Sequence, residues 1–367
     1  MARTTATNDL GVTAARGRRF TGPAARWLFG LALALALAGC APNLAPPGPG
    51  APADAPKIDS QAIVTDDGAV LPLRAWLPPS NPAPAVKAVI LALHGFNDYS
   101  NAFDRPGAWW AQRGIATYAY DQRGFGEAPH RGLWAGTERL AADVADAVDA
   151  LSRRHPRLPV YLLGTSMGGA VAVAAMTGPE PPEVDGVILA APAVWARSTM
   201  PAYQRAALWL GATFLPWMTV SGAELDILAS DNIEMLRALG RDPLFIKETR
   251  VDAVAGLTDL MDTALAAAPH LEGPALILYG EKDEVIPWGP TRTFWTRLPK
   301  AGGGPDIRLA LYRDGWHMLL RDLQAEVVWR DIAHWIEKPN APLPSAAERH
   351  AARALADPDF EPERRER

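Results

Sequence analysis

Residues 160–176 read VYLLGTSMGGAVAVAAM, and this stretch decides the fold of the 367-residue chain. Its first four residues are apolar and predict a buried strand, whereas its last eight are small and apolar and predict a helix. Between them lies a G-x-S-x-G motif, and this order predicts a tight turn that lifts the Ser166 hydroxyl to the top of a sheet. Gly164 and Gly168 fit the turn, because a Cβ at either position would clash with the neighbouring strand and helix.

Similar apolar runs alternate with helical patterns over most of the chain. They are short and nearly continuous, which is typical of strands buried on both faces of a parallel sheet. Two earlier runs, at 61–64 and 70–76, flank an Asp-Asp-Gly turn signal and predict an antiparallel hairpin. We therefore predict an α/β fold with a mostly parallel, doubly wound sheet and antiparallel N-terminal strands. The runs predicted as parallel strands lie at 88–93, 115–120, 160–163, 187–191, 275–279 and 307–311.

Residues 194–262 interrupt this alternation, because they contain helical patterns rich in aromatic residues and no strand-like run. An insertion at this position would lie above the carboxyl ends of the strands, where ligands bind in such sheets. We predict a helical cap that supplies Trp209, Phe214 and Trp217 as substrate-binding residues. The alternative is that these aromatic side chains only pack the insertion onto the sheet.

A serine hydroxyl becomes a nucleophile when a base removes its proton and an acid orients that base. Where the serine lies on a strand–turn–helix, the chain order is Ser166, then Asp or Glu, then His. His317 follows the last predicted strand and fits the base. Of the other later histidines, His270 precedes the acid-bearing strand, His334 lies in a predicted helix and His350 lies in the C-terminal tail.

Three carboxylates follow the strand at 275–279, and each is a candidate for the acid: Glu281, Asp283 and Glu284. The tetrahedral intermediate of acyl transfer also needs two N–H donors. One should be the backbone N–H of Met167, and the other that of Phe96, in the loop after an early strand.

Together these residues resemble the α/β-hydrolases, over roughly residues 63–337. Within them, the chain is similar to the monoacylglycerol lipase and lysophospholipase-like branch, also called serine aminopeptidase S33 or Hydrolase-4. The form Gly-x-x-Asp-x-x-Val/Ile-Pro implies Asp283 as the acid, and the resemblance also implies Ser166 as nucleophile, His317 as base, and Phe96 and Met167 as oxyanion donors. The motifs that carry the resemblance are HGF at 94–96, DQRGFG at 121–126, GTSMGG at 164–169, GEKDEVIP at 280–287 and WH at 316–317.

The resemblance implies a serine hydrolase that cleaves carboxylic esters through an acyl-enzyme, with a lipid or a small ester as substrate. A monoacylglycerol lipase or lysophospholipase-like esterase is the first expectation. Thioesterase, small-ester esterase and aminopeptidase activities on the same triad are alternatives, as is a lipoprotein without catalysis.

The N-terminus has the pattern of an export signal. Residues 1–39 carry five arginines against one acid, and the apolar run at 27–38 has signal-peptide length. Leu37-Ala38-Gly39-Cys40 resembles the bacterial lipoprotein signal, which implies cleavage before Cys40, lipidation of its thiol and anchoring to a membrane. We therefore expect an exported lipoprotein at the bacterial outer membrane or periplasmic face. Cys40 is the only cysteine in the chain, so it cannot form an internal disulfide.

The net charge of −5 argues against a nucleic-acid partner, and the basic residues of the N-terminus make the remainder still more acidic. No Cys/His group has metal-ligand spacing and no phosphate-binding glycine loop occurs in the sequence, so we expect neither a metal nor another cofactor. The predicted segments are a signal peptide (1–39), a Pro/Ala-rich tether (40–57), the core (58–193), the cap (194–262), the second part of the core (263–337) and a charged flexible tail (338–367). We expect the tail to trail on the surface, with at most a short helix near 346–355.

Overall fold

The computed structural model describes residues 42–50, 56–59, 61–79, 85–222, 226–299 and 307–362. The chain divides into two units, Met1–Ala41 and Pro42–Arg367, and the described residues all belong to the second. The predicted signal peptide and Cys40 lie outside the described residues. In the described part, no helix combines the length and apolarity needed to cross a bilayer.

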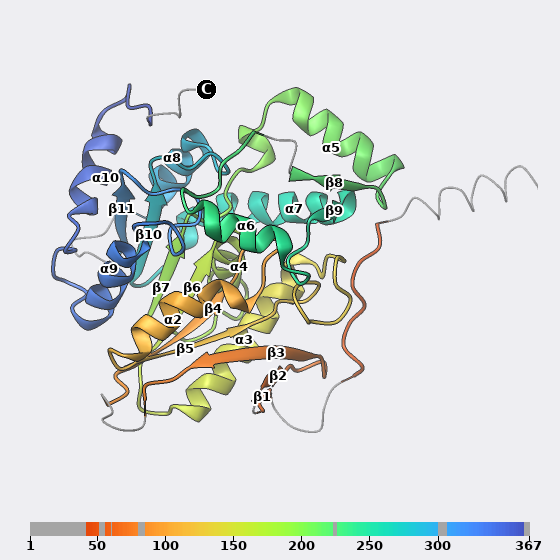
Figure 1. The fold of residues 1–367 in the computed structure, drawn as a ribbon. Coiled ribbons are helices and arrows are strands. Elements are labelled where there is room, and N and C mark those ends of the chain that lie inside the picture. Colours follow the sequence, from red (N-terminus) through yellow and green to blue (C-terminus); the bar gives the residue numbers. More distant parts are fainter. Residues whose placement is uncertain are drawn as a thin grey trace, which may run out of the picture. The chain divides into compact units, whose positions relative to one another are not determined.

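Among the described residues, nine strands form one sheet in the order β1-β2-β3-β5-β4-β6-β7-β10-β11 (Figure 1). Neighbours from β5 to β11 are parallel, whereas β1, β2, β3 and β5 pair antiparallel. The predicted fold class is therefore confirmed. The strands are β1 (Lys57–Ile58), β2 (Ala62–Val64), β3 (Val70–Trp76), β4 (Ala88–Leu93), β5 (Ile115–Tyr120), β6 (Val160–Thr165), β7 (Gly186–Ala190), β10 (Ala275–Gly280) and β11 (Ile307–Tyr312).

The helices cover the two faces of the sheet. On one face α2 packs against α9, and the Trp110 indole N–H donates to the Trp329 carbonyl across this contact at 3.0 Å. On the other, α4 contacts both α3 and α7. The helices are α2 (Asp104–Ala111), α3 (Thr137–Arg154), α4 (Met167–Met176), α5 (Ala202–Phe214), α6 (Ile233–Arg241), α7 (Val251–Ala267), α8 (Trp288–Arg297), α9 (Ala325–Glu337) and α10 (Ala347–Ala356), with 3-10 helices η1 (Ser100–Phe103), η2 (Arg197–Thr199) and η4 (Ala268–His270).

Burial explains why the apolar runs are continuous. Every residue of β4, β5, β7 and β10 is buried, because helices cover both faces of these inner strands. Each predicted run coincides with a strand to within two residues at either end. The parallel pairing of β4 with β6 and of β6 with β7 brings their carboxyl ends to one edge of the sheet, where Ser166 follows β6.

The inserted segment 194–262 differs from the prediction in two respects. It contains η2, α5, α6 and most of α7, but α7 continues to Ala267, past the predicted end of the cap. It also contains two strands that pair antiparallel, β8 (Thr219–Ser221) and β9 (Glu248–Arg250). Strands of three residues are too short to show a period in the sequence, so the prediction of no strand was wrong here.

The C-terminal segment is packed against the sheet at residues 339–356 rather than trailing from it. Helix α10 contacts β11 and buries Ala347, Ala351 and Ala354. The Arg308 guanidinium on β11 donates to the Glu348 carboxylate at 2.6 Å. The short helix predicted near 346–355 is present as α10. The prediction that the tail trails on the surface was wrong for residues 341–356, because alanines at helical spacing give α10 one face that can be buried.

The described part of the predicted tether also lies against the body. The Asn43 N–H donates to the Asp252 carboxylate at 3.1 Å, and the Ala45 N–H donates to the Trp134 carbonyl at 2.8 Å. The Gly48 N–H donates to the Asp67 carboxylate at 2.8 Å. Residues 42–50 are thus held on the body, whereas the sequence predicts a tether over this stretch.

A buried ion pair joins the N-terminal hairpin to α3. The Arg123 guanidinium donates to Asp143 at 2.7 and 2.9 Å and to Asp67 at 2.9 and 2.6 Å. The Asp143 side chain is fully buried. Burial raises the pKa of Asp143, and the Arg123 guanidinium opposes this rise.

Replacing Arg123 should therefore destabilise the fold strongly. In an Arg123→Leu variant the buried Asp143 carboxylate has lost its main partner, so we expect the free energy of unfolding to fall by about 3–5 kcal/mol. Denaturant unfolding measures this. Arg330→Leu, which breaks an exposed pair with Glu326, is the control and should leave the midpoint nearly unchanged.

The same variant should show a characteristic pH dependence. Without Arg123 the pKa of Asp143 rises further, and a carboxyl with a raised folded-state pKa destabilises the fold only while it is ionised. The deficit relative to the wild type should therefore shrink from about pH 7 to about pH 5. A deficit that stays constant over this range would contradict the role assigned to Asp143.

Candidate active site

Ser166 lies in a sharp turn between β6 and α4. Its backbone φ is 51°, a region that residues other than glycine rarely adopt. A Cβ on Gly164 would lie 2.3 Å from the Gly168 carbonyl oxygen, and one on Gly168 would lie 2.2 Å from the Leu93 carbonyl oxygen. The steric reason for both glycines is thus as the sequence predicts.

The structure brings together the three side chains predicted as a triad. His317 Nε2 lies 2.9 Å from Ser166 Oγ, and His317 Nδ1 lies 2.8 Å from Asp283 Oδ2. The Asp283 side chain is fully buried and the His317 side chain nearly so. When Nδ1–H donates to Asp283, the lone pair of Nε2 faces the Ser166 hydroxyl, and this tautomer can accept the hydroxyl proton.

Backbone geometry distinguishes Asp283 from its two acidic neighbours. Its second oxygen, Oδ1, accepts the N–H groups of Val285 and Ile286 at 2.8 and 2.9 Å, which fixes the carboxylate toward His317. Glu284 instead accepts the Leu228 N–H at 2.7 Å. Glu281 lies on the other side of its loop, 2.5 Å from His350.

The loop after β4 approaches Ser166 closely and is braced by His94. A Cβ on Gly95 would lie 3.3 Å from Ser166 Cβ. His94 Nε2 accepts the Gln122 N–H at 2.9 Å, so its Nδ1–H donates to the Gly95 carbonyl at 2.8 Å. Burial lowers the pKa of His94, which keeps the ring neutral and suited to this pair of contacts.

The two predicted oxyanion donors lie beside the serine. Phe96 lines the same cavity as Ser166, and Met167 is the first residue of α4. Neither backbone N–H donates to another residue in the described part of the chain. Both are therefore available to a bound oxygen, and their role stays a prediction.

The inserted segment holds the loop after β4 in place. Asn97, whose φ is 65°, donates its side-chain N–H to Thr249 Oγ1 at 2.7 Å, and its carbonyl accepts the Ile246 N–H at 3.0 Å. The Tyr99 hydroxyl donates to Asp242 at 2.7 Å. These contacts couple the position of the oxyanion loop to the position of the insertion.

The loop that carries His317 is fixed by a buried carboxylate. Asp322 accepts the Trp316 N–H at 2.8 Å and the Ser230 hydroxyl at 2.6 Å. Burial raises the pKa of Asp322 to about 6, although both hydrogen bonds oppose the rise. Sequence reasoning missed Asp322, because an aspartate in a loop carries no signal of burial.

A cavity of about 410 Å³ opens at Ser166 and His317. Its wall is mostly apolar, and its polar edge includes the ion pair of Asp98 with Arg321. No group of three or more His, Cys, Asp or Glu side chains in the described ranges could hold a metal ion. The apolar residues that extend from the serine include Trp195, Ile227, Leu257, Met261, Val285 and Met318.

The predicted substrate-binding residues Trp209, Phe214 and Trp217 do not line this cavity. Their side chains are about half exposed or more, at 62%, 54% and 49%, and no residue of α5 is buried. That prediction is corrected: α5 is the outer helix of the insertion, whereas Trp195 and α7 form its inner wall. The sequence marks the insertion as aromatic but does not say which of its helices faces inward.

Comparison with known proteins places the chain among relatives. Residues 84–324 match the Hydrolase_4 family, described as serine aminopeptidase, S33. The chain is 25% identical over 266 residues to a monoacylglycerol lipase of Mycolicibacterium smegmatis, covering 71% of this chain and 90% of the relative. It is 26% identical over 302 residues to human monoglyceride lipase, covering 81% and 96%.

Solved structures share the fold at lower identity. A soluble variant of monoglyceride lipase from Saccharomyces cerevisiae, in complex with a substrate analogue, gives a TM-score of 0.62 at 20% identity and covers 81% of this chain and 100% of that one. The Paleococcus ferrophilus monoacylglycerol lipase gives 0.59 at 20% identity, covering 72% and 98%. These likenesses concern the α/β-hydrolase fold. Since the family match spans more than half of the chain and contains Ser166, Asp283 and His317, the chain belongs to the Hydrolase_4 family of serine aminopeptidase S33 type.

Proposed function

We propose that this protein is a serine hydrolase that cleaves carboxylic esters of lipids through an acyl-enzyme, most closely a monoacylglycerol lipase or lysophospholipase. One observation carries the proposal: the Ser166–His317–Asp283 contacts open directly onto an apolar cavity. The names of the two curated relatives, a monoacylglycerol lipase and a monoglyceride lipase, support the same substrate class.

In the proposed reaction, His317 Nε2 takes the Ser166 proton as Oγ attacks the ester carbonyl. Asp283 stabilises the imidazolium that forms, and the N–H groups of Phe96 and Met167 donate to the oxyanion. The alcohol leaves with the proton held by His317. Water then attacks the acyl-enzyme, with His317 again as the base, and releases the fatty acid and the free serine.

The cavity favours a lipid ester over a peptide. A peptide substrate needs polar groups along its backbone and a counter-charge for its amino terminus, whereas the wall beyond Ser166 is formed by side chains such as Trp195, Leu257 and Met261. An acyl chain buried there gains about 0.8 kcal/mol for each CH₂ group. The Asp98–Arg321 pair at the polar edge can accept and donate hydrogen bonds to the hydroxyl groups of a head group.

We further propose that the protein is exported, and that Cys40 is lipidated and anchors it at the bacterial outer membrane or the periplasmic face. The support is the signal-like sequence of residues 1–40. The Asn43 N–H donates to Asp252, so in the sequence the lipidated residue would precede a body-bound residue by only three positions.

The nucleophile can be tested directly. Ser166→Ala should lose fluorophosphonate labelling and lower kcat for a monoacylglycerol by about four orders of magnitude or more, because the acyl-enzyme cannot form. Circular dichroism should match the wild type. Full esterase activity in this variant would overturn the assignment of Ser166 as the nucleophile. If the wild type does not react with the fluorophosphonate while a control hydrolase does, the proposal that the protein is a serine hydrolase is wrong.

The acyl pocket can be tested by filling it. Leu257→Trp should lower kcat/KM for long-chain monoacylglycerols by about tenfold or more while sparing short-chain p-nitrophenyl esters, because the added ring occupies the space of distal methylenes. Trp209→Ala is the matched control in the same insertion and should leave kcat/KM unchanged for both substrate classes. The opposite pattern would place the acyl chain on α5. Thioesters and aminoacyl anilides in the same panel decide between ester, thioester and amide chemistry.

Lipidation is tested separately. Cells that express the wild type should incorporate labelled fatty acid into the protein and retain it in the membrane fraction. Cys40→Ser should do neither, because the thiol is the attachment point. Incorporation that survives the substitution would exclude Cys40 as the lipidated residue.

A further inference from the structure

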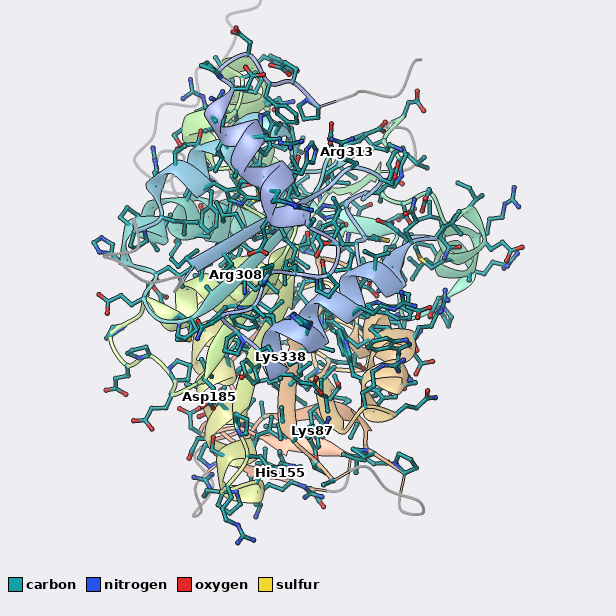
Figure 2. The ribbon with its side chains drawn as sticks, turned by 90° about the vertical axis from the view of Figure 1, so that its left-hand side faces the viewer. Lys87, His155, Asp185, Arg308, Arg313 and Lys338 are labelled. Carbon is teal, nitrogen blue, oxygen red and sulfur yellow. The ribbon has the colours of Figure 1, made fainter. Side chains whose placement is uncertain are left out.

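A second cavity lies between the loop after β11 and helices α9 and α10, and has a volume of about 500 Å³. It shares only Leu319 with the cavity at Ser166. Figure 2 shows Arg313 on this side of the molecule, beside α10. The proposed lipid hydrolysis makes no use of this cavity.

Three arginines line this second cavity. Arg313 follows β11, whereas Arg349 and Arg353 lie four residues apart on α10 and therefore project from the same side of the helix. Their guanidinium groups make no hydrogen bond or ion pair with any residue in the described part of the chain. Asp314 attracts the charge of its neighbour Arg313, but no carboxylate in the described ranges forms an ion pair with any of the three.

The two carboxylates that adjoin these arginines in the sequence form ion pairs with other cations. Asp314 pairs with Lys282 at 2.8 Å, and Glu348 pairs with Arg308. His350, which also lines the cavity, lies against Glu281. The remaining carboxylate in the wall, Asp322, is buried and accepts the Trp316 N–H and the Ser230 hydroxyl.

We propose that this cavity binds a phosphate-bearing anion. The planar fork of a guanidinium matches phosphate oxygens with two parallel hydrogen bonds, and three such groups suit an anion with several charged oxygens. No carboxylate of the described residues forms an ion pair with these arginines, and a bound anion offsets their mutual repulsion. The volume exceeds that of a phosphate group alone, and Val327 and Val328 of α9 offer an apolar side to an attached organic group. The ligand is therefore a phosphate ester, either free or as the head group of a lipid.

The experiment compares these two sources. Calorimetric titration of the full-length protein with glycerol 3-phosphate measures binding of a free ester. Co-sedimentation with phosphatidylcholine vesicles, with and without phosphatidic acid, measures binding of a lipid head group as the difference between the two vesicle types.

We expect the wild type to bind in at least one of the two experiments. The single variants Arg349→Ala and Arg353→Ala should each weaken that binding about tenfold or more. Arg313→Ala should act in the same direction. Arg349→Lys keeps the charge but loses the fork, and should weaken binding less than alanine does. Arg154→Ala, an exposed arginine on α3, is the matched control and should bind as the wild type does.

Binding of glycerol 3-phosphate supports the proposal with a free ester as ligand, and binding to phosphatidic acid vesicles alone supports it with a lipid head group. Absence of binding in both arms overturns the proposal. So does an equal loss in Arg154→Ala, since that would indicate only the overall charge. All four cavity substitutions are at exposed positions, and circular dichroism checks that each variant is folded.

Discussion

The backbone of Ser166 is the constraint on which the site depends. A φ of 51° costs on the order of 1–3 kcal/mol for a residue with a side chain, so the surrounding structure must hold it. It does so through the next strand: the Ser166 N–H donates to the Ala190 carbonyl at 3.0 Å, and the Ser166 carbonyl accepts the Ala193 N–H at 2.9 Å. Gly164 lacks the Cβ that would separate β6 from α4, and Gly168 lacks the one that would separate α4 from the end of β4. The strained turn therefore exists only inside the assembled parallel sheet.

The parts of the fold that the sequence predicts well are those with one strong physical signature. Strands such as β4 and β10 are buried on both faces, so their apolar runs are unbroken and easy to recognise. The order of Ser166, an acid and His317 follows from the topology of the turn and of the strand ends. The choice of Asp283 over Glu281 needed the family's motif. The two acids lie two residues apart on one loop, and the sequence does not show which side chain points toward His317. The structure supplies the physical reason in two backbone N–H donors.

The parts that the sequence does not predict are those where packing depends on contacts far along the chain. Trp209 and Phe214 lie on the aromatic-rich helix α5, but the sequence of this helix does not indicate that it lies outside α7. Likewise α10 is rich in charge, but its alanine face is buried on β11 and Glu348 meets Arg308, forty residues earlier. In each case the local composition allows both an exposed and a buried arrangement, and tertiary contacts select one.

The loop that carries His317 lies between two cavities of opposite character, one apolar and one lined by arginines. Its position is set by the buried Asp322 carboxylate, which accepts the Trp316 N–H, and by two backbone contacts. The Gly315 carbonyl accepts the Lys282 N–H at 2.9 Å, and the Met318 N–H donates to the Ala229 carbonyl at 3.0 Å. None of these bonds uses an arginine of the second cavity. Substitution of the arginines of the second cavity should therefore leave the His317 imidazole in place. The two proposals are thus independent: loss of anion binding would not argue against the hydrolase, and loss of hydrolysis would not argue against the anion site.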